Sequence, residues 1–274
     1  MTEEDSPPDA ARGRIICGLQ PVREAIRAHG RKLERVLVET EASGGSPQLE
    51  ALARYARDQG VRVERAGRHH LDRMARGVRH QGAIALAPEL LLTPLDELPA
   101  EPSALIVALD EVQDPQNFGA VVRSSVAMGA TAVVWPEHRS APLSPAMFRA
   151  SAGGIEHATL CRVASLTAAL ESLRARGVAV VGLDMEGTRR IDAIDLRRGS
   201  CLVVGAEGKG LRRTVKRLCD ELARLPMPGP LASLNASVAV AIGLYEAVRQ
   251  RAAGGCLSAD PFAIPASNVA SLPK

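Results

Sequence analysis

Short runs of consecutive apolar residues recur along the chain and alternate with stretches of helical periodicity. Between residues 103 and 255, the runs that predict strands span residues 105–109, 132–135, 159–163, 178–183, 201–204 and 223–226. Helical patterns span residues 119–128, 145–152, 166–176 and 211–218. Because these strands are apolar throughout rather than alternating, both of their faces are expected to be buried. The pattern predicts an α/β fold whose parallel sheet is covered by helices on both faces.

A smaller α/β unit precedes this sheet, over residues 15–90. Apolar runs at residues 36–38, 61–63 and 83–87 predict strands, and helical spacing covers residues 21–28 and 49–59. Residues 91–102 contain three prolines and no periodicity, so we expect a linker that allows the two units to move. Residues 1–14 predict a disordered leader, and the Pro- and Ser-rich residues 256–274 predict a flexible tail.

The composition is ordinary for a soluble protein, with 46% hydrophobic and 24% charged residues. No apolar run approaches the roughly 20 residues that span a bilayer, and no secretory signal pattern follows the acidic first residues. We therefore expect a cytoplasmic protein without membrane contact. The five cysteines are an odd number without a CxxC pair, which disfavours a disulfide framework and a cysteine-bound zinc site.

Parallel sheets place their ligands beyond the carboxyl ends of the strands, and the first unusual strand end covers residues 109–123. A polar turn at Asp114-Pro115 leads into a helix near Asn117. Asn117 stands where a helix-capping side chain would, and capping is its alternative role. Arg123 lies in an otherwise apolar helix, so we expect it to be paired or to face a cleft.

The second strand end is a glycine loop over residues 205–210. It matches neither a Walker A loop nor the dinucleotide fingerprint, and it carries one carboxylate, Glu207, suited to a cationic ligand or a hydroxyl.

The third unusual strand end, over residues 225–241, is a stiff Pro/Gly loop that leads through Ser233 and Asn235 into a very apolar helix. Helix capping is again the alternative for both residues. The helix itself predicts burial against a sheet or a partner subunit.

Taken in order, residues 117–123, 205–210 and 226–239 resemble the three motifs NxGAxxR, GxEGxG and PMxGxxxSLNxSVA of the SpoU/TrmH family of RNA ribose 2′-O-methyltransferases. His80-Gln81-Gly82 and Cys17-Gly18-Leu19 resemble the small substrate-binding domain of that family. The resemblance covers roughly residues 15–252. It is greatest to the RlmB group, which methylates a guanosine ribose of 23S ribosomal RNA. A doubled proline around Gly229 and an alanine at Ala236 depart from the common pattern.

This resemblance implies a trefoil-knotted, SPOUT-type methyltransferase domain that binds S-adenosylmethionine and acts as a homodimer on ribosomal RNA or an assembling ribosomal subunit. It implies a catalytic cluster of Asn117, Arg123, Glu207, Ser233 and Asn235. It implies cofactor binding by Gly205, Glu207, Gly208, Leu225, Met227 and Leu234. The family's Arg123 has been proposed as the base. Because a neutral guanidinium is costly, binding the target phosphate and stabilising the alkoxide is an equally good role, with Glu207 as its fork-like partner.

Arginine makes up 30 of the 34 basic residues, although the net charge is only +3. Arginine suits bidentate phosphate contacts, but a GC-rich genome would also favour it. We expect RNA binding by Arg62, Arg65, Arg68, Arg73, Arg76, Arg79 and His80, with a solvated basic face as the alternative. The pair His69-His70 lacks further ligands, so no metal is expected. Aromatic residues amount to 2%, which disfavours a binder that stacks successive bases on aromatic platforms.

Two rival functions remain at this point. One is a 2′-O-methyltransferase that acts on tRNA or on another ribosomal RNA site, as do antibiotic-resistance methylases of similar two-domain build. The other is a non-catalytic RNA-binding factor of ribosome assembly that keeps the fold. The intact polar residues of all three motifs disfavour the second.

Overall fold

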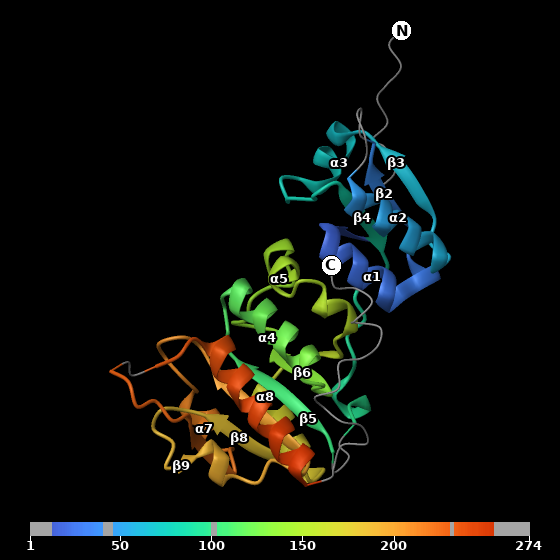
Figure 1. Ribbon diagram of the computed structural model, residues 1–274. Coiled ribbons are helices and arrows are strands. Elements are labelled where there is room, and N and C mark those ends of the chain that lie inside the picture. The colour runs from blue at the N-terminus through green and yellow to red at the C-terminus, as the bar shows by residue number, and fades with distance from the viewer. Residues whose placement is uncertain (1–12, 41–45, 100–102, 231–232, 255–274) are drawn as a thin grey trace. The chain divides into compact units, whose positions relative to one another are not determined.

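The computed structural model describes residues 13–40, 46–99, 103–230 and 233–254 (Figure 1). The predicted tail and all but the last two residues of the predicted leader lie outside these ranges. The chain divides into two units. The first comprises residues 1–91 together with 143–157, and the second comprises residues 92–142 and 158–274.

The first unit contains a four-stranded mixed sheet in the order β1-β4-β2-β3. Its strands are β1 (Arg14–Cys17), β2 (Arg35–Glu39), β3 (Val63–Ala66) and β4 (Ala83–Ala87). Its helices are α1 (Leu19–His29), α2 (Pro47–Asp58), α3 (Arg68–Ala75) and α5 (Pro145–Ala150). β4 pairs antiparallel with β1 and β2, whereas β2 and β3 run parallel. The predicted strands appear here, and β1 is an addition.

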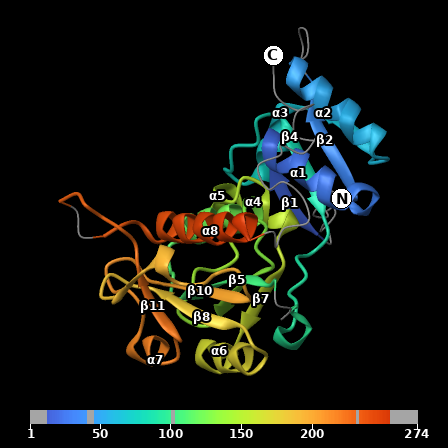
Figure 2. The same cartoon turned by 60° about the horizontal axis from the view of Figure 1, so that its bottom comes forward.

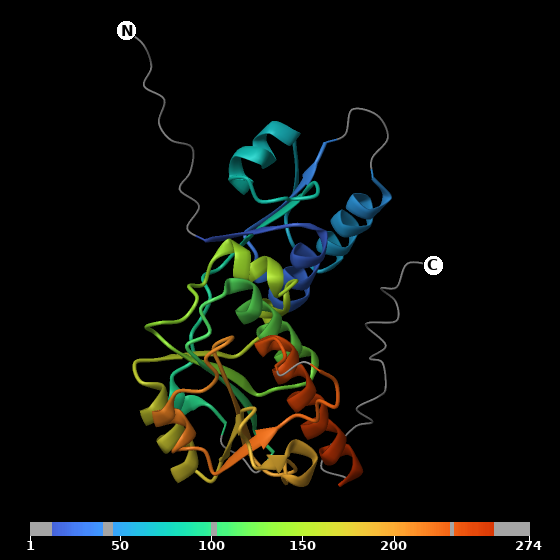
Figure 3. The same ribbon diagram turned by 90° about the vertical axis from the view of Figure 1, so that its left-hand side faces the viewer.

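Helices cover both faces of this sheet because side chains along each strand alternate between the faces. Val36 and Val38 of β2 pack in one cluster with residues of α1 and α2. Leu37, between them, packs instead with Leu71 and Ala75 of α3. Figure 3 accordingly shows α3, in teal, and α2, in blue, on opposite sides of the strands.

The second unit is built on a seven-stranded sheet in the order β7-β6-β5-β10-β8-β11-β9. Its strands are β5 (Leu105–Asp110), β6 (Ala132–Pro136), β7 (Leu160–Val163), β8 (Ala179–Leu183), β9 (Arg189–Arg190), β10 (Ser200–Gly205) and β11 (Glu221–Arg224). Every pairing in it is parallel. The predicted parallel sheet is therefore confirmed, with the two-residue strand β9 as an addition.

Helices lie on both faces of this sheet as predicted (Figure 2). Helix α6 (Leu166–Ala175) and the short α7 (Arg213–Lys216) share a core with Ile106 and Val203 on one face. Helices α4 (Pro115–Ala127) and α8 (Ala236–Ala253) pack together on the other. There, a β-carbon built on Gly243 of α8 would lie 3.3 Å from Leu202 of β10. The trefoil knot implied by the family resemblance stays a prediction.

The segment predicted as a free linker is instead part of the second unit. Leu92 bridges Leu160 at the start of β7, and Leu98 is buried in the core beside α6. Arg176 donates hydrogen bonds to the carbonyls of Leu95 and Leu98. The prolines therefore shape a packed segment, and the prediction of a loose linker is wrong for residues 92–98.

Residues 143–157 belong to the first unit although they follow β6 of the second, a division that the sequence pattern did not predict. Their anchor is Glu156, whose side chain is 2% exposed. It accepts two hydrogen bonds from Arg14, at 2.9 and 2.6 Å, and lies 2.8 Å from His29 Nε2. Gly153 adopts a left-handed φ of +87°, and a β-carbon there would lie 2.6 Å from the Glu24 β-carbon of α1.

Glu156→Gln is predicted to destabilise the first unit. Burial raises the pKa of Glu156, but the hydrogen bonds and charge of Arg14, and then those of His29, outweigh it and lower the pKa. Losing one member of a buried pair costs about 3–5 kcal/mol. Because the pKa is lowered on folding, this stabilisation exists above the unfolded value of about 4.3 and is lost as the pH falls through the folded value.

Urea unfolding of the full-length protein measures the effect. The variant's midpoint should fall well below that of the parent at pH 7, and the two should converge below about pH 4. Glu50→Gln, which removes an exposed partner of Arg65, is the control and should shift the midpoint little. A Glu156→Gln midpoint equal to that of this control at pH 7 would contradict the assigned role.

Candidate active site

The predicted chemistry-bearing loops leave neighbouring strands at one edge of the second sheet. β5 and β10 are adjacent, and their register places Gly205 opposite Asp110, so both strands end together. The loop after β5 leads into α4, and the loop after β10 carries Glu207. Parallel neighbours with aligned ends bring their following loops side by side.

Asp114, not Asn117, caps helix α4. The Asp114 carboxylate accepts hydrogen bonds from the backbone N–H groups of Gln116 and Asn117, at 3.1 and 3.2 Å. Pro115 occupies the first helical position, where its missing N–H costs nothing. The capping alternative for Asn117 is therefore wrong, and its buried side chain is left to make other contacts.

Asn117, Glu207 and Asn235 form one hydrogen-bonded chain across the three motifs. Asn235 caps α8, with its side-chain oxygen accepting from the Ser237 N–H at 2.9 Å. Because a backbone N–H only donates, this bond orients the Asn235 amide. Its nitrogen then donates to Asn117 Oδ1 at 2.7 Å, and Asn117 Nδ2 donates to Glu207 Oε2 at 3.1 Å.

Arg123 and Ser233 stand outside this chain. Arg123 is exposed on α4, and within the part of the chain that the structure describes it has no hydrogen bond or ion pair. The predicted Glu207–Arg123 fork is therefore absent, since the Glu207 oxygen Oε2 accepts from Asn117 instead. Ser233 is exposed and is one of the residues that line the cavity described next.

The glycine loop is held against its own strand. A β-carbon on Gly205 would collide with the backbone of Gly210, so only glycine fits there. At the far end of the loop, the buried Asp110 accepts from Arg212 N at 2.8 Å and from Arg212 Nε at 2.6 Å. Burial raises the Asp110 pKa against the opposing effect of Arg212. These contacts fix the loop between β10 and α7.

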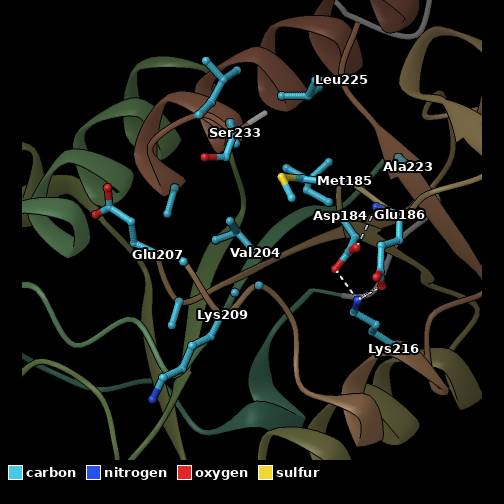
Figure 4. Close-up of a pocket in the computed structure, with 18 of the residues that line it drawn as sticks. Asp184, Met185, Glu186, Val204, Glu207, Lys209, Lys216, Ala223, Leu225 and Ser233 are labelled. Atoms are coloured by element: carbon cyan, nitrogen blue, oxygen red, sulfur yellow. Dashed lines mark hydrogen bonds and ion pairs between the residues drawn. The ribbon is translucent and has the colours of Figure 1, made fainter. Parts of the chain in front are cut away.

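A cavity of about 360 Å³ lies against this loop (Figure 4). All the predicted cofactor-binding residues line it, namely Gly205, Glu207, Gly208, Leu225, Met227 and Leu234. Its walls combine apolar residues, such as Leu183 and Val204, with glycines and charged side chains. In Figure 4, Glu207 lies on one side of the cavity, and a charged group lies on the other, with Asp184 and Glu186 from the loop after β8 and Lys216 from α7.

That charged group is the part of the site that the sequence did not reveal. Lys216 Nζ lies 2.9 Å from Asp184 Oδ2 and 2.6 Å from Glu186 Oε2, and all three residues line the cavity. The two carboxylates raise the Lys216 pKa, Glu186 most strongly. Asp184 directly follows β8, so its position at a strand end was the available signal.

The residues predicted to bind RNA fall into three groups in the first unit. Arg62, Arg65 and Arg68 are paired with the carboxylates of Glu64, Glu50 and Glu39. A second group is exposed and has no ion pair or hydrogen bond among the described residues; it consists of Arg73, Arg76 and Arg79.

His80 forms the third group because it is buried, at 5% exposure. Its Nδ1 accepts from the Gly82 N–H at 3.0 Å, and its Nε2 lies 2.9 Å from the Asp72 carboxylate. Both ring nitrogens are thereby occupied. His80 holds the turn at residues 80–82 rather than offering a free ring to RNA, which corrects the prediction for this residue.

Within the described ranges, no group of three or more His, Cys, Asp or Glu side chains is arranged to hold a metal ion. No helix in those ranges has the length and apolar character needed to cross a membrane.

Two family profiles match the chain in sequence. The SpoU rRNA methylase family matches residues 104–245, and the RNA 2′-O ribose methyltransferase substrate-binding domain matches residues 15–91. The methylase match contains all five residues of the predicted catalytic cluster.

Individual relatives and structures agree with these profiles. The 23S rRNA (guanosine-2′-O-)-methyltransferase RlmB of Xanthomonas campestris pv. campestris is 38% identical over 241 residues, which cover 86% of this chain and 96% of that protein. An uncharacterized tRNA/rRNA methyltransferase of Mycolicibacterium vanbaalenii is 40% identical over 86% of this chain and 76% of its own length. The crystal structure of the SpoU methyltransferase AviRb from Streptomyces viridochromogenes with the cofactor AdoMet aligns with a TM-score of 0.72 at 27% identity, covering 89% of this chain and 92% of that one. The chain belongs to the SpoU rRNA methylase family and is an S-adenosylmethionine-dependent RNA ribose 2′-O-methyltransferase with an N-terminal substrate-binding domain.

Proposed function

We propose that this enzyme transfers a methyl group from S-adenosylmethionine to the ribose 2′-oxygen of a guanosine in 23S ribosomal RNA. The observation that carries the proposal is the chain from Asn235 through Asn117 to Glu207, which joins the three motifs at the edge of the cavity. The choice of 23S ribosomal RNA rests on the RlmB relatives, named for that activity. We place the reaction in the cytoplasm, where ribosomal RNA is assembled.

The cavity fits the cofactor by size and chemistry. Its volume of about 360 Å³ is within the range of small-molecule sites. Leu225 and Met227 offer apolar surface to the adenine and methionine parts. Glu207 places a carboxylate where a cofactor with ammonium and sulfonium charges gains favourable electrostatics, whereas the Asp184 carboxylate is already paired with Lys216. When bound, S-adenosylmethionine supplies an electrophilic methyl group on sulfur.

We assign roles to the residues of the site from the hydrogen-bond donors and acceptors that they still have available. Asn117 and Asn235 hold the Glu207 carboxylate at Oε2, which leaves Oε1 to accept a hydrogen bond from a ribose hydroxyl. Arg123 keeps its full set of donors. We assign it to the phosphate beside the target ribose and to the negative charge that develops on the 2′-oxygen, because a guanidinium does not readily give up its proton.

The active unit is proposed to be a homodimer formed through α8. Val238, Ile242 and Tyr245 are 44%, 37% and 50% exposed and share one stripe of the helix, beside Ser124 of α4. An exposed apolar stripe of this kind is typical of an interface, and a two-fold axis would place it against itself. The implied trefoil knot is part of the same proposal.

Mapping of 2′-O-methyl sites in ribosomal RNA, with and without the gene, tests the function. Loss of one methylated guanosine of 23S ribosomal RNA is expected. Loss of a methyl group from tRNA or from a different ribosomal RNA would support the rival substrate. An unchanged map, together with no methyl incorporation in vitro, would favour the non-catalytic assembly factor.

Arg123→Ala is predicted to lower the methylation rate by at least about 100-fold, the cost of one preorganised charge stabiliser. Cofactor affinity and thermal stability should stay near those of the parent, because Arg123 is exposed and does not line the cavity. Rates of methyl incorporation and calorimetric cofactor titration give the two readouts. Arg123→Lys distinguishes a two-pronged phosphate contact from a simple cation, and a lysine variant with the parent's rate would refute the fork-like role.

Gly205→Ala is predicted to weaken S-adenosylmethionine binding by about tenfold or more. A β-carbon there displaces the backbone of Gly210, and overpacking of this kind costs about 1–3 kcal/mol. Isothermal titration calorimetry measures the affinity. Gly67→Ala is the control, since a β-carbon there meets open space in the other unit. Equal affinities for both variants would remove the glycine loop from the cofactor site.

Ile242→Glu is predicted to convert the dimer into a monomer. A charge at the centre of the α8 stripe would be desolvated without a partner in the dimer but solvated in the monomer. Analytical ultracentrifugation of the parent and the variant reports the mass directly. A variant that sediments as a dimer would exclude this face.

A further inference from the structure

A second, larger cavity lies within the first unit and has no part in the chemistry above. Its volume is about 990 Å³. It is lined by β1, by α3 and the turn after it, and by residues 145–156, the stretch that joins this unit from beyond β6. The substrate-binding profile covers residues 15–91 only, so the last of these walls is not part of that match.

The cavity carries uncompensated positive charge. Arg73, Arg76 and Arg149 line it and are exposed, and no ion pair or hydrogen bond to any of them occurs within the described ranges. Glu156 is the one carboxylate among the lining residues that the structure describes, and Arg14 and His29 already engage it. An anionic ligand would therefore meet three free guanidinium groups.

Arg149 reaches this cavity from a different part of the chain than the other two arginines. It lies close enough to Cys17 of β1 for its charge to act on the thiol, although burial dominates and raises the Cys17 pKa to about 11. Arginines from two distant parts of the chain, α3 with the turn after it and residues 145–156, therefore line the same cavity. A solvated basic face built from one stretch of sequence would not bring them together.

The backbone at Arg76 points to a role for its side chain. Arg76 ends α3 in the left-handed conformation, with a φ of +48°, where glycine is ordinarily favoured. A non-glycine residue there costs about 1 kcal/mol or more, and such strain concentrates at ligand sites. An arginine therefore occupies a position at which the fold alone would favour glycine.

The remaining walls are apolar. Met74, Val78 and the ring of Phe148 line the cavity, and the Arg14 guanidinium lies 5.5 Å from the centre of that ring. Apolar and aromatic surface beside cationic groups suits a flat base with its attached phosphates. A fully paired helix would offer no base face to these walls, because its bases stay stacked.

We propose that this cavity binds an unstacked nucleotide of the RNA substrate, with the base against Met74, Val78 and Phe148 and the flanking phosphates on Arg73, Arg76 and Arg149. The proposal rests on the enzyme acting on RNA. It makes Arg149 an RNA-binding residue and residues 145–156 a part of the substrate site. The site would read a single-stranded loop or bulge of the substrate.

The test measures affinity for a 23S ribosomal RNA transcript as a function of salt, with full-length variants. Arg149→Ala should flatten the slope of log affinity against log salt by about 0.7–0.9, the effect of one lost phosphate contact. Phe148→Leu should weaken binding about fivefold or more through lost stacking, with an unchanged slope. Arg57→Ala, an exposed arginine of α2 outside the cavity, is the charge-matched control and should leave both quantities unchanged.

Arg76→Gly separates ligand binding from folding. It should flatten the slope by the same amount as Arg149→Ala while the thermal midpoint stays equal or rises, because glycine relieves the left-handed strain. A falling midpoint with unchanged RNA affinity would show a structural role only and would overturn the proposal for this residue.

Competition identifies the occupant. A single-stranded dodecaribonucleotide should displace the transcript from the parent, and it should do so more weakly from Arg149→Ala; a duplex of the same length should compete poorly with both. Polyglutamate that competes as well as the single strand would indicate general charge attraction and overturn the proposal.

Methyl incorporation measured in parallel keeps the two claims apart. A parent that methylates 23S ribosomal RNA, with Arg149→Ala retaining its affinity and slope, would overturn the cavity and leave the function standing. A parent that binds but does not methylate, with Arg149→Ala weakened, would leave the cavity standing and overturn the proposed reaction.

Discussion

The pairing of β10 with β5 is the constraint on which the site depends. These strands are separated by about half of the second unit's sequence, yet their register sets Gly205 against Asp110 so that both end at one level. The loop after each strand then emerges beside the other. If β10 were shifted by one residue, its side chains would exchange faces, and Glu207 would no longer meet the start of α4. The buried apolar strand therefore fixes the positions of the two loops as well as the core.

The polar chain at this edge also satisfies the ends of two helices. Asp114 and Asn235 cap α4 and α8. A capping side chain commonly makes no contact beyond its hydrogen bond to the backbone of its own helix. Here the Asn235 amide has a second group to use, and it donates to Asn117. The cap of α8 therefore fixes the direction of the Asn235 amide, which orients Asn117 and, through it, the Glu207 carboxylate at the cavity. Asn235 therefore combines capping with a contact to a second motif, whereas at α4 the two tasks are divided between Asp114, which caps the helix, and Asn117, which contacts Glu207.

The sequence predicted the parallel sheet and its helices on both faces because these depend on local signals, whereas the residues that line the cavity followed from the family resemblance. Buried strands are continuous apolar runs, and the Gly and Pro loops mark the strand ends. The pairs that depend on distant partners could not be predicted. The sequence shows six arginines between residues 62 and 79, but not that three of them meet carboxylates from β3, α2 and β2. Likewise, the sequence did not show that Glu207 accepts a hydrogen bond from Asn117 rather than from Arg123, the partner we expected.

The boundary between the two units also depends on contacts between distant residues, which the sequence pattern did not predict. Proline content suggested a free linker at residues 91–102, but Leu98 is a core residue of the methyltransferase unit and Leu92 pairs with β7. A chain that starts after residue 100 would lose these contacts. Residues 143–157 would also lose Arg14 and His29, their partners at Glu156. The two units are interleaved along the chain, so a deletion cannot remove one without affecting the other, and point substitutions are the way to probe one unit at a time.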